Sequence, residues 1–460
     1  MAPKFGTSGL RGLVTELTEA LVRDYVTAFI AACPHAGTVY VGRDLRPSSP
    51  QIAGWVMDAV QACGLDAVEC GAVPTPALAL ASIEAGAAAV MVTGSHIPAD
   101  RNGLKFYLPS GEISKADEAA IGAALGTVAQ ADALGGRRSE EAGAAYVARY
   151  ATAYGRALDG LCVGIYQHSS VARDLMVAVF EALGARAVPI APSDVFIPVD
   201  TEALDPETQK LFSGWFETHG LDVLVSTDGD ADRPMVVDDA GRVVPGDVLG
   251  TLTAQALGAE IVVTPVSSNS MVADPRFGFD LKRTKIGSPF VIAGMEQALA
   301  ADPQAPVVGF EANGGFLLGF TADAPAGPLP PLMTRDCLLP IIAPLVAARA
   351  QGQTLSAAWD ALPPVFTAAD RLQGIETEKS KAFLAELSAS AEARAAFLGE
   401  AETDLDETDG LRMTLDGGRV VHLRPSGNAP EFHCYAEAGD RDAATRLMRA
   451  TLDKVRARLG

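Results

Sequence analysis

Residues 223–233 read Val-Leu-Val-Ser-Thr-Asp-Gly-Asp-Ala-Asp-Arg. An apolar run that breaks into a polar, glycine-containing loop is typical of a buried strand in an α/β sheet and the loop at its carboxyl end. The same format recurs at residues 89–96 (Ala-Val-Met-Val-Thr-Gly-Ser-His), 306–314 (Pro-Val-Val-Gly-Phe-Glu-Ala-Asn-Gly) and 420–428 (Val-Val-His-Leu-Arg-Pro-Ser-Gly-Asn). Ligands of open α/β sheets bind beyond the carboxyl ends of the strands. The four loops therefore predict a single cleft to which each domain contributes one loop.

Around these strands the sequence alternates helical and extended patterns. Apolar residues recur at helical spacing between residues 17 and 30, and residues 38–41 read as a short buried strand. A second helical pattern at 175–183 is followed by an apolar run at 185–190. This alternation predicts doubly wound, mainly parallel sheets, used more than once. On composition, residues 131–143 resemble a linker, and residues 322–331 resemble a stiff loop.

Composition and charge exclude several classes of protein. The chain has 460 residues, of which 48% are hydrophobic, enough for about three or four domains. Its net charge of −21 disfavours binding to nucleic acid or to anionic membranes. No segment has the length and apolar character to span a bilayer, and no secretory signal is expected. Six cysteines without a CxxC pair indicate reduced thiols and a cytoplasmic location. The expected assembly is a monomer or a homodimer.

The three aspartates of the loop at 228–232 form a candidate metal site. Their carboxylates face one way if the loop continues the extended strand, and grouped anionic oxygens require a cation. A calcium EF-hand would need Gly at loop position six and Glu at position twelve, whereas Arg233 and Asp239 stand there. Mg²⁺ is the expected ion, with a phosphate completing its coordination. The simpler alternative is an acidic, solvated turn.

Ser95 lies on a glycine-containing turn, next to His96 and shortly before Lys105. The turn lacks the Gly-x-Ser-x-Gly pattern of acyl-transfer enzymes, since Thr93 and Ile97 stand at the glycine positions. Ser95 instead suits a phosphoryl carrier whose oxygens complete the Mg²⁺ shell. His96 and Lys105 then supply positive charge or proton transfer. A turn or N-cap serine is the plainer alternative.

Two further loops carry groups that suit a phosphate and sugar hydroxyls. The last loop holds the donors that a phosphate dianion needs: a guanidinium, a hydroxyl, an amide and backbone N–H groups. They belong to Arg424, Ser426, Gly427 and Asn428. In the third loop, Glu311 and Asn313 offer a carboxylate and an amide to vicinal sugar hydroxyls. A Pro-bounded turn and a surface carboxylate are the plainer alternatives.

Together these loops resemble those of the α-D-phosphohexomutase family, in the same order over nearly the whole chain. The opening signature of the family is similar to residues 6–12 (Gly-Thr-Ser-Gly-Leu-Arg-Gly), and its next basic segment to residues 42–49. Residues 93–105 resemble its phosphoserine loop, residues 228–233 its Mg²⁺ loop and residues 424–427 its phosphate loop.

The resemblance implies a fold. Three related α/β domains with doubly wound mixed sheets, and a smaller α+β C-terminal domain, are expected around a central cleft. The expected domains are 1–143 with the phosphoserine loop, 144–244 with the Mg²⁺ loop, 245–360 with the sugar loop and 361–460 with the phosphate loop.

The reaction implied by the resemblance interconverts hexose 6-phosphate and hexose 1-phosphate. Phosphorylated Ser95 gives its phosphoryl group to the sugar, and a hexose 1,6-bisphosphate reorients before it returns the other group to Ser95. Such a transfer needs mainly positioning and charge stabilisation. The implied ligands of Mg²⁺ are Ser95, Asp228, Asp230 and Asp232.

The resemblance also implies roles for the other matched residues. Lys105 and His96 are the expected acid/base pair. Lys105 is preferred because burial and nearby cations lower the pKa of a lysine. Arg11 and Arg233 are expected to neutralise the transferring phosphoryl group, and Lys285 to help hold the substrate. Glu311 and Asn313 remain the expected sugar contacts, and Arg424, Ser426, Gly427 and Asn428 the expected phosphate contacts.

Alternatives remain open for the identity of the sugar and for the class of reaction. Asn313 replaces a serine that is common in the family's sugar loop, and Gly315 replaces a histidine. Residues 97–101 most resemble the members that act on mannose phosphates, so mannose is expected, with glucose and glucosamine phosphates as alternatives. In another class, residues 223–230 resemble the opening of aspartyl-phosphate phosphatases, where Asp228 would be the nucleophile. A non-catalytic sugar-phosphate sensor is a third reading.

Overall fold

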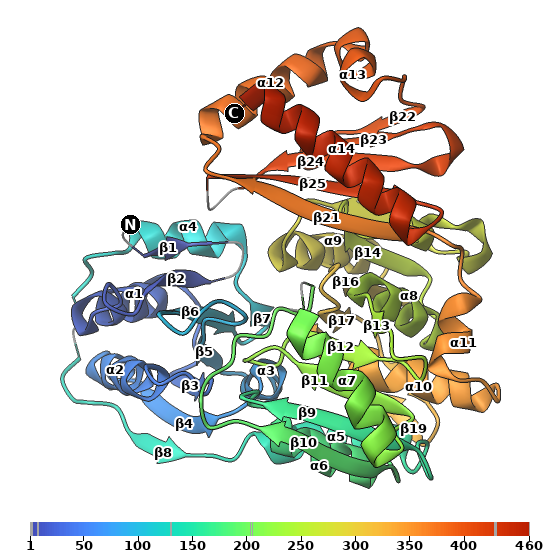
Figure 1. The fold of residues 1–460 in the computed structure, drawn as a ribbon. Coiled ribbons are helices and arrows are strands. Elements are labelled where there is room, and N and C mark those ends of the chain that lie inside the picture. Colours follow the sequence, from blue (N-terminus) through green and yellow to red (C-terminus); the bar gives the residue numbers. More distant parts are fainter. Residues whose placement is uncertain are drawn as a thin grey trace.

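The chain folds into four units that each carry a β-sheet, as the computed structural model in Figure 1 shows. The structure describes residues 3–6, 9–128, 131–202, 204, 206–426 and 430–459. Three units have mixed sheets covered by helices, and the C-terminal unit has an antiparallel sheet. The expected fold class of three related α/β domains and a smaller α+β domain is confirmed.

The first unit is built from residues 4–139. Its elements are β1 (Lys4–Phe5), β2 (Leu10–Leu13), α1 (Glu19–Ala32), β3 (Thr38–Arg43), α2 (Ser49–Ala62), β4 (Asp66–Ala72), α3 (Thr75–Glu84), β5 (Ala88–Val92), β6 (Arg101–Leu108), β7 (Gly111–Glu112), α4 (Lys115–Ala123) and β8 (Arg137–Ser139).

The second unit follows directly. Its elements are α5 (Gly143–Tyr154), β9 (Cys162–His168), α6 (Arg173–Ala182), β10 (Arg186–Pro192), α7 (Pro206–His219), β11 (Val223–Thr227), β12 (Pro234–Val237) and β13 (Val243–Val244).

The third unit also contains a two-stranded hairpin. Its elements are α8 (Gly246–Ala256), β14 (Ile261–Pro265), the 3₁₀ turns η1 (Ser270–Ala273) and η2 (Pro275–Phe277), β15 (Asp280–Thr284), α9 (Ser288–Ala301), β16 (Val307–Phe310), β17 (Phe316–Leu318), β18 (Ala322–Ala324), β19 (Gly327–Leu329), β20 (Leu332–Asp336), α10 (Leu339–Ala350) and α11 (Leu355–Asp360).

The fourth unit, orange to red in Figure 1, lies above the other three. Its elements are β21 (Phe366–Gln373), α12 (Thr377–Ala389), α13 (Ala391–Leu398), β22 (Asp404–Asp406), β23 (Leu411–Thr414), the 3₁₀ turn η3 (Asp416–Gly418), β24 (Val420–Pro425), β25 (Glu431–Ala438) and α14 (Arg441–Leu459).

The first three sheets share one strand pattern. The orders β4-β3-β5-β6-β2, β10-β9-β11-β12-β13 and β15-β14-β16-β17-β20 each begin with three parallel strands and add two more strands through antiparallel pairings. In each sheet the third strand, β5, β11 or β16, is the last parallel one. It precedes one of the polar loops predicted above. The switch of direction at this strand is where open α/β sheets bind ligands.

Helix α1 shows how the sequence pattern sets the local structure. The Thr18 side chain accepts a hydrogen bond from the Leu21 backbone N–H at 3.4 Å and so caps the helix. Val22, Val26 and Phe29, spaced three and four residues apart, are fully buried. The helical pattern recognised at 17–30 is therefore the face that α1 packs against the sheet.

The hydrophobic cores tie the first three units together. One continuous core includes Leu78 of α3, Tyr150 of α5, Leu249 of α8 and Ile341 of α10. The C-terminal unit keeps a core of its own around Phe432. Burial therefore makes a single body of the three α/β units and leaves the C-terminal unit attached mainly through polar contacts, several of which line the cleft described below.

Two segments contain strands that their composition did not indicate. Residues 131–143 contain β8, which pairs in parallel with β4 and extends the first sheet. Residues 322–329 form the β18–β19 hairpin rather than an irregular loop. Each strand in these two segments is only three residues long, which is too short to show a periodic pattern in the sequence. Within the part of the chain that the structure describes, no helix combines the length and hydropathy that crossing a bilayer requires.

Candidate active site

A buried arginine, Arg46, fixes the conformation of the loop that carries Ser95. Ser95 follows β5, has a φ of 54° and is 1% exposed. The Arg46 guanidinium donates to the carbonyl oxygens of Ser95 at 2.7 Å, Ile97 at 2.6 Å and Pro98 at 2.7 Å. Asp44 pairs with Arg46 at 3.0 Å and accepts the Thr93 hydroxyl at 2.8 Å. The loop is therefore fixed through its backbone, and Arg46 makes no contact with the Ser95 hydroxyl that would keep it from the groups described below.

Gly94 is required at this turn. A Cβ atom on residue 94 would lie 2.6 Å from Cζ of Arg46, whose guanidinium is pinned by the loop carbonyls. The glycine before Ser95 thus serves the close approach of Arg46.

The Asp228 loop is curled, not extended. Ala231 takes a left-handed φ of 59°, and the Asp228 carboxylate accepts the backbone N–H groups of Asp232 at 3.2 Å and Arg233 at 3.3 Å. The expected extended geometry is therefore wrong, because the chain turns back on the first carboxylate. The three aspartates nevertheless converge: all are fully buried, and one carboxylate oxygen from each lies within 4.8 Å of the others.

The carboxylates fit a divalent cation. Oδ1 of Asp230 and Oδ1 of Asp232 are buried and make no hydrogen bond. Burial, and then the charges of the other two aspartates, raise the pKa of Asp228 well above its ordinary value. Buried anionic oxygens without partners cost free energy that a hard cation removes. Oxygen-only donors of this kind suit Mg²⁺.

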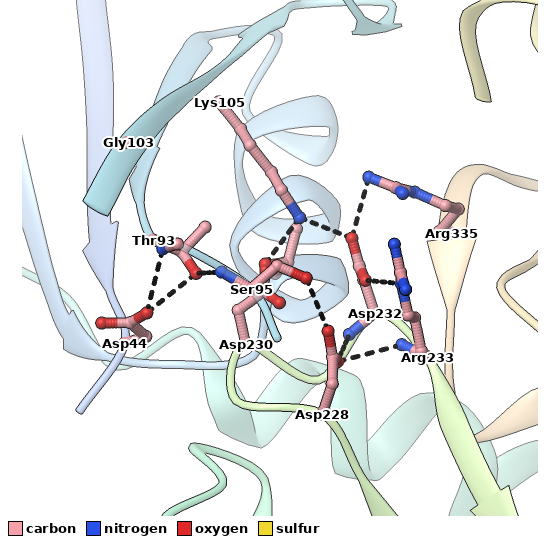
Figure 2. Close-up of polar contacts among 12 residues, drawn as sticks. Asp44, Thr93, Ser95, Gly103, Lys105, Asp228, Asp230, Asp232, Arg233 and Arg335 are labelled. Atoms are coloured by element: carbon pink, nitrogen blue, oxygen red, sulfur yellow. Dashed lines mark hydrogen bonds and ion pairs between the residues drawn. The ribbon is translucent and has the colours of Figure 1, made fainter. Parts of the chain in front are cut away.

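Ser95 belongs to the same cluster. Its hydroxyl donates to Oδ2 of Asp228 at 2.7 Å, which joins the loops of the first and second units. Figure 2 shows the two side chains facing each other. The predicted metal ligands Ser95, Asp228, Asp230 and Asp232 are therefore brought together.

Lys105, on β6, completes the carboxylate cluster. Its ammonium donates to Oδ2 of Asp230 at 2.6 Å and to Oδ2 of Asp232 at 2.5 Å (Figure 2). Burial lowers the pKa of Lys105, but these two carboxylates outweigh it and raise the pKa above its ordinary value. The Lys105 pKa therefore moves opposite to the expected direction, because the aspartates outweigh burial and the charge of Arg335.

His96 lies beside the hydroxyl of Ser95, with Nδ1 3.3 Å from Oγ. Burial, and then the charges of Arg233 and Arg11, lower the pKa of His96 to about 2. The imidazole is consequently neutral, and it offers a hydrogen bond to Oγ rather than positive charge.

Arg11 and Arg233 supply positive charge near this cluster. Arg233 follows the metal loop, and its guanidinium lies 3.5 Å from Glu202 and 3.9 Å from Asp232. Burial, and next the charge of Arg233, lower the pKa of Arg11 to about 10, at which it is still charged at neutral pH. The two guanidinium groups are thus close neighbours on the metal side of the site.

The sugar loop after β16 turns tightly. Glu311 and Asn313 are 6% and 8% exposed, and the Asn313 carboxamide lies 3.4 Å from Glu311. Gly314, with φ +87°, lets the loop pack on the second unit, since a Cβ there would lie 2.7 Å from Cγ of Pro234. The loop of the third unit is thereby held next to the metal loop.

Asp409 contacts both the phosphate loop and Ile286, the residue after Lys285. Asp409 lies 3.5 Å from the Arg424 guanidinium and accepts the backbone N–H of Ile286 at 3.0 Å. The backbone N–H of Ser426 donates to the Glu431 carbonyl at 2.8 Å. Lys285 is exposed beside this contact. Gly427 and Asn428, like Thr7 and Ser8 of the opening motif, lie outside the described residues.

A cavity of about 580 Å³ lies between the second, third and fourth units. Its lining includes Glu202, Asp247, Ala312 and Tyr435. Glu202 contacts Arg233 of the metal side, and Tyr435 belongs to the C-terminal sheet, so the cavity adjoins both.

Several residues of the site were missed by sequence reasoning. They are Arg335, Glu112, Glu202 and the buried pair Asp44 and Arg46. Arg335 lies inside β20 and not in a glycine-containing loop, so no local pattern marks it. Arg46 lies in the basic segment at residues 42–49, but that segment does not reveal that its guanidinium binds the carbonyl oxygens of the Ser95 loop.

The chain matches four successive family models. They are the phosphoglucomutase/phosphomannomutase alpha/beta/alpha domains I, II and III, at residues 2–132, 144–241 and 245–366, and the C-terminal domain, at residues 372–454.

Curated relatives match over the full length. A phosphomannomutase of Sinorhizobium fredii is 47% identical and is aligned over 97% of this chain and 98% of its own. A phosphomannomutase of Salmonella muenchen is 40% identical, over 99% and 96% of the two chains.

Solved structures share the fold. A phosphoglucomutase/phosphomannomutase family protein of Burkholderia thailandensis superposes with a TM-score of 0.77 at 22% identity, covering 98% of this chain and 97% of its own. With all four domain models matched in order and relatives aligned end to end, the chain belongs to the phosphoglucomutase/phosphomannomutase family.

Proposed function

We propose that this chain is a phosphohexomutase that interconverts hexose 6-phosphate and hexose 1-phosphate, with mannose phosphate as its preferred substrate. The observation that carries the proposal is the hydrogen bond of 2.7 Å between the Ser95 hydroxyl and Asp228 within a buried group of three carboxylates. A hydroxyl placed at a hard-cation site is placed to carry a phosphoryl group. The names of the two curated relatives support mannose as the sugar.

The transfer step follows from the groups around Ser95. The P–O bond to Oγ breaks while a sugar hydroxyl forms the new P–O bond, so the hydroxyl loses a proton and Oγ gains one. His96, 3.3 Å from Oγ, and Lys105, on Asp230 and Asp232, are the groups placed to move these protons. Arg11 and Arg233 balance the charge of the transferring group.

Ser95, Asp228, Asp230 and Asp232 would hold Mg²⁺, the proposed cofactor. When bound, this ion supplies a Lewis acid that withdraws negative charge from the phosphoryl oxygens.

The second half of the reaction requires that the protein bind the phosphate group that is not being transferred. Arg424 and Ser426, with Gly427 and Asn428, are the proposed phosphate contacts, and Lys285 is placed beside them across Asp409. Glu311 and Asn313 are the proposed contacts of the sugar hydroxyls. The hexose 1,6-bisphosphate formed in the first step reorients between the metal side and the phosphate loop, and it then returns its other phosphoryl group to Ser95.

We place the domain boundaries at 1–143, 144–244, 245–360 and 361–460. Two of these boundaries fall between regular elements, since Pro245 is the N-terminal cap of α8 and α11 ends at Asp360. The first boundary falls one residue into α5, which begins at Gly143. The proposed assembly is a monomer or a homodimer. The proposed location is the cytoplasm, because all six cysteines are free.

The phosphatase alternative is disfavoured by the surroundings of Asp228. Oδ1 of Asp228 accepts two backbone N–H groups, and Oδ2 accepts the Ser95 hydroxyl. A carboxylate with both oxygens engaged is a poor nucleophile, whereas the Ser95 hydroxyl already faces the cluster.

Turnover of three sugars tests the substrate. Mannose 1-phosphate, glucose 1-phosphate and glucosamine 1-phosphate are compared by kcat/KM with Mg²⁺ and a catalytic amount of hexose bisphosphate. The proposal expects mannose 1-phosphate to have the highest kcat/KM. A clear preference for either of the other sugars would replace the proposed substrate, and release of inorganic phosphate without isomerisation would replace the reaction class.

Chelation of divalent ions should stop turnover and leave the fold intact. Lys105 already neutralises part of the carboxylate charge, and the cores of the first and fourth units contain no residue of the metal loop. Circular dichroism and thermal melting with excess EDTA are therefore expected to show a folded protein without activity, which returns when Mg²⁺ is added. Global unfolding on chelation would instead indicate a structural metal.

A further inference from the structure

Arg335 joins acidic residues of three different units. Its guanidinium lies 2.8 Å from Oδ2 of Asp232 in the metal loop, 3.4 Å from Glu311 in the sugar loop and 3.7 Å from Glu112 in β7 of the first unit. The side chain is 4% exposed. Figure 2 shows it approaching Asp232 from the side opposite to Ser95. A planar fork of N–H donors is the group suited to hold several carboxylates at once.

The two oxygens of Asp232 are used differently. Oδ2 receives both Lys105, at 2.5 Å, and Arg335, at 2.8 Å. Oδ1 is buried and makes no hydrogen bond. Arg335 therefore helps to fix the rotation of this carboxylate. Oδ1, which has Arg233 3.9 Å away but makes no hydrogen bond, is the oxygen left for a cation.

The sugar loop is shaped around the same side chain. A Cβ on residue 315 would lie 2.9 Å from Cδ and 3.0 Å from Cγ of Arg335. Gly315 thus gives the arginine stem room to pass the sugar loop and reach Glu311. The stem cannot easily move aside, since its guanidinium is held by carboxylates at the far end.

Glu112 anchors the arrangement in the first unit. It accepts the Thr334 hydroxyl at 3.0 Å and the Ser288 hydroxyl at 3.1 Å, besides its ion pair with Arg335. The strand that carries Arg335 is therefore fixed to the unit that carries Ser95.

From these contacts we infer that Arg335 is a positioning residue that couples the metal loop to the sugar loop. It orients Asp232 for the cation and Glu311 for the sugar hydroxyls, so that metal binding and substrate binding depend on one side chain. The inference rests on the proposed function for its sugar half. Its metal half is independent of that function.

The test uses Arg335→Met, which keeps the stem and removes the charge, and Arg335→Lys, which keeps a charge without the fork. Arg23→Met, at an exposed ion pair on α1, is the matched control. Mn²⁺ serves as a spectroscopic probe of the carboxylate site, and its binding is measured without sugar by electron paramagnetic resonance. The second readout is kcat and KM for mannose 1-phosphate with saturating Mg²⁺.

For Arg335→Met we expect Mn²⁺ binding weakened by about 10- to 100-fold, together with a raised KM, as for other groups that orient a metal ligand. A lysine can hold Asp232 or Glu311 but does not bridge both, so Arg335→Lys is expected to remain impaired in at least one readout. Arg23→Met should match the unmodified chain in both.

Wild-type Mn²⁺ affinity and KM in Arg335→Met would overturn the inference. If that variant fails to fold by circular dichroism, Arg335→Lys decides, and normal values in both of its readouts would overturn the inference equally. Absence of turnover in the unmodified chain would contradict the proposed function alone, because the Mn²⁺ comparison does not need substrate.

Discussion

Ser95→Ala should abolish isomerisation while sugar phosphates still bind. The variant removes the oxygen that carries the phosphoryl group, and among the described residues no second side-chain hydroxyl donates to the Asp228 carboxylate. The expected loss of kcat is on the order of 10⁴-fold or more, as for removal of other nucleophiles. The proposed sugar and phosphate contacts, Glu311 and Arg424 among them, are untouched.

The Ser95→Ala loop should keep its shape, since Arg46 holds it through backbone carbonyls that alanine retains. Turnover is measured with a coupled assay, and mannose 6-phosphate binding by calorimetry. Ser213→Ala on the exposed face of α7 is the control for serine removal. Residual isomerisation near the wild-type rate would exclude transfer through Ser95.

Lys105→Met is expected to have the second largest effect, on catalysis and on stability together. Loss of a group that moves a proton costs about 10²- to 10⁴-fold in kcat. The substitution also leaves Asp230 and Asp232 without the ammonium that bonds to both. Breaking a buried charge pair in this way destabilises a protein by about 3–5 kcal/mol.

The stability loss in Lys105→Met should depend on the metal. With EDTA the carboxylates repel one another, so the midpoint of thermal melting is expected to fall. Added Mg²⁺ should then raise this midpoint more in the variant than in the unmodified chain. Lys210→Met on the surface of α7 is the matched control. Unchanged melting in EDTA, or an unchanged kcat, would contradict the role given to Lys105.

The positions of the polar loops were predictable because a buried strand and the loop after it appear in the sequence as an apolar run followed by polar residues. The apolar runs before Ser95, Asp228 and Glu311 are β5, β11 and β16, and each stands at the same place in its sheet. The three related topologies then bring the loops to one region. The resemblance to a known family added the order of the loops along the chain.

The arrangement of charges was less predictable. The Asp228 loop curls because Ala231 adopts a left-handed backbone, which an alternating sequence does not reveal. The pKa of Lys105 moves upward because two aspartates from another unit surround it, a pairing set only by the packing of units. Arg335 carries no motif of its own, since its role comes from Asp232, Glu311 and Glu112, which are distant in sequence.

The central claim is that Ser95 carries the phosphoryl group. The most direct test charges the purified protein with a ³²P-labelled hexose 1,6-bisphosphate, followed by acid treatment and peptide mapping by mass spectrometry. The account predicts one acid-stable phosphate, on the peptide that contains Ser95. An acid-labile phosphate on Asp228, or no labelling of Ser95 under conditions in which the protein turns over, would contradict it.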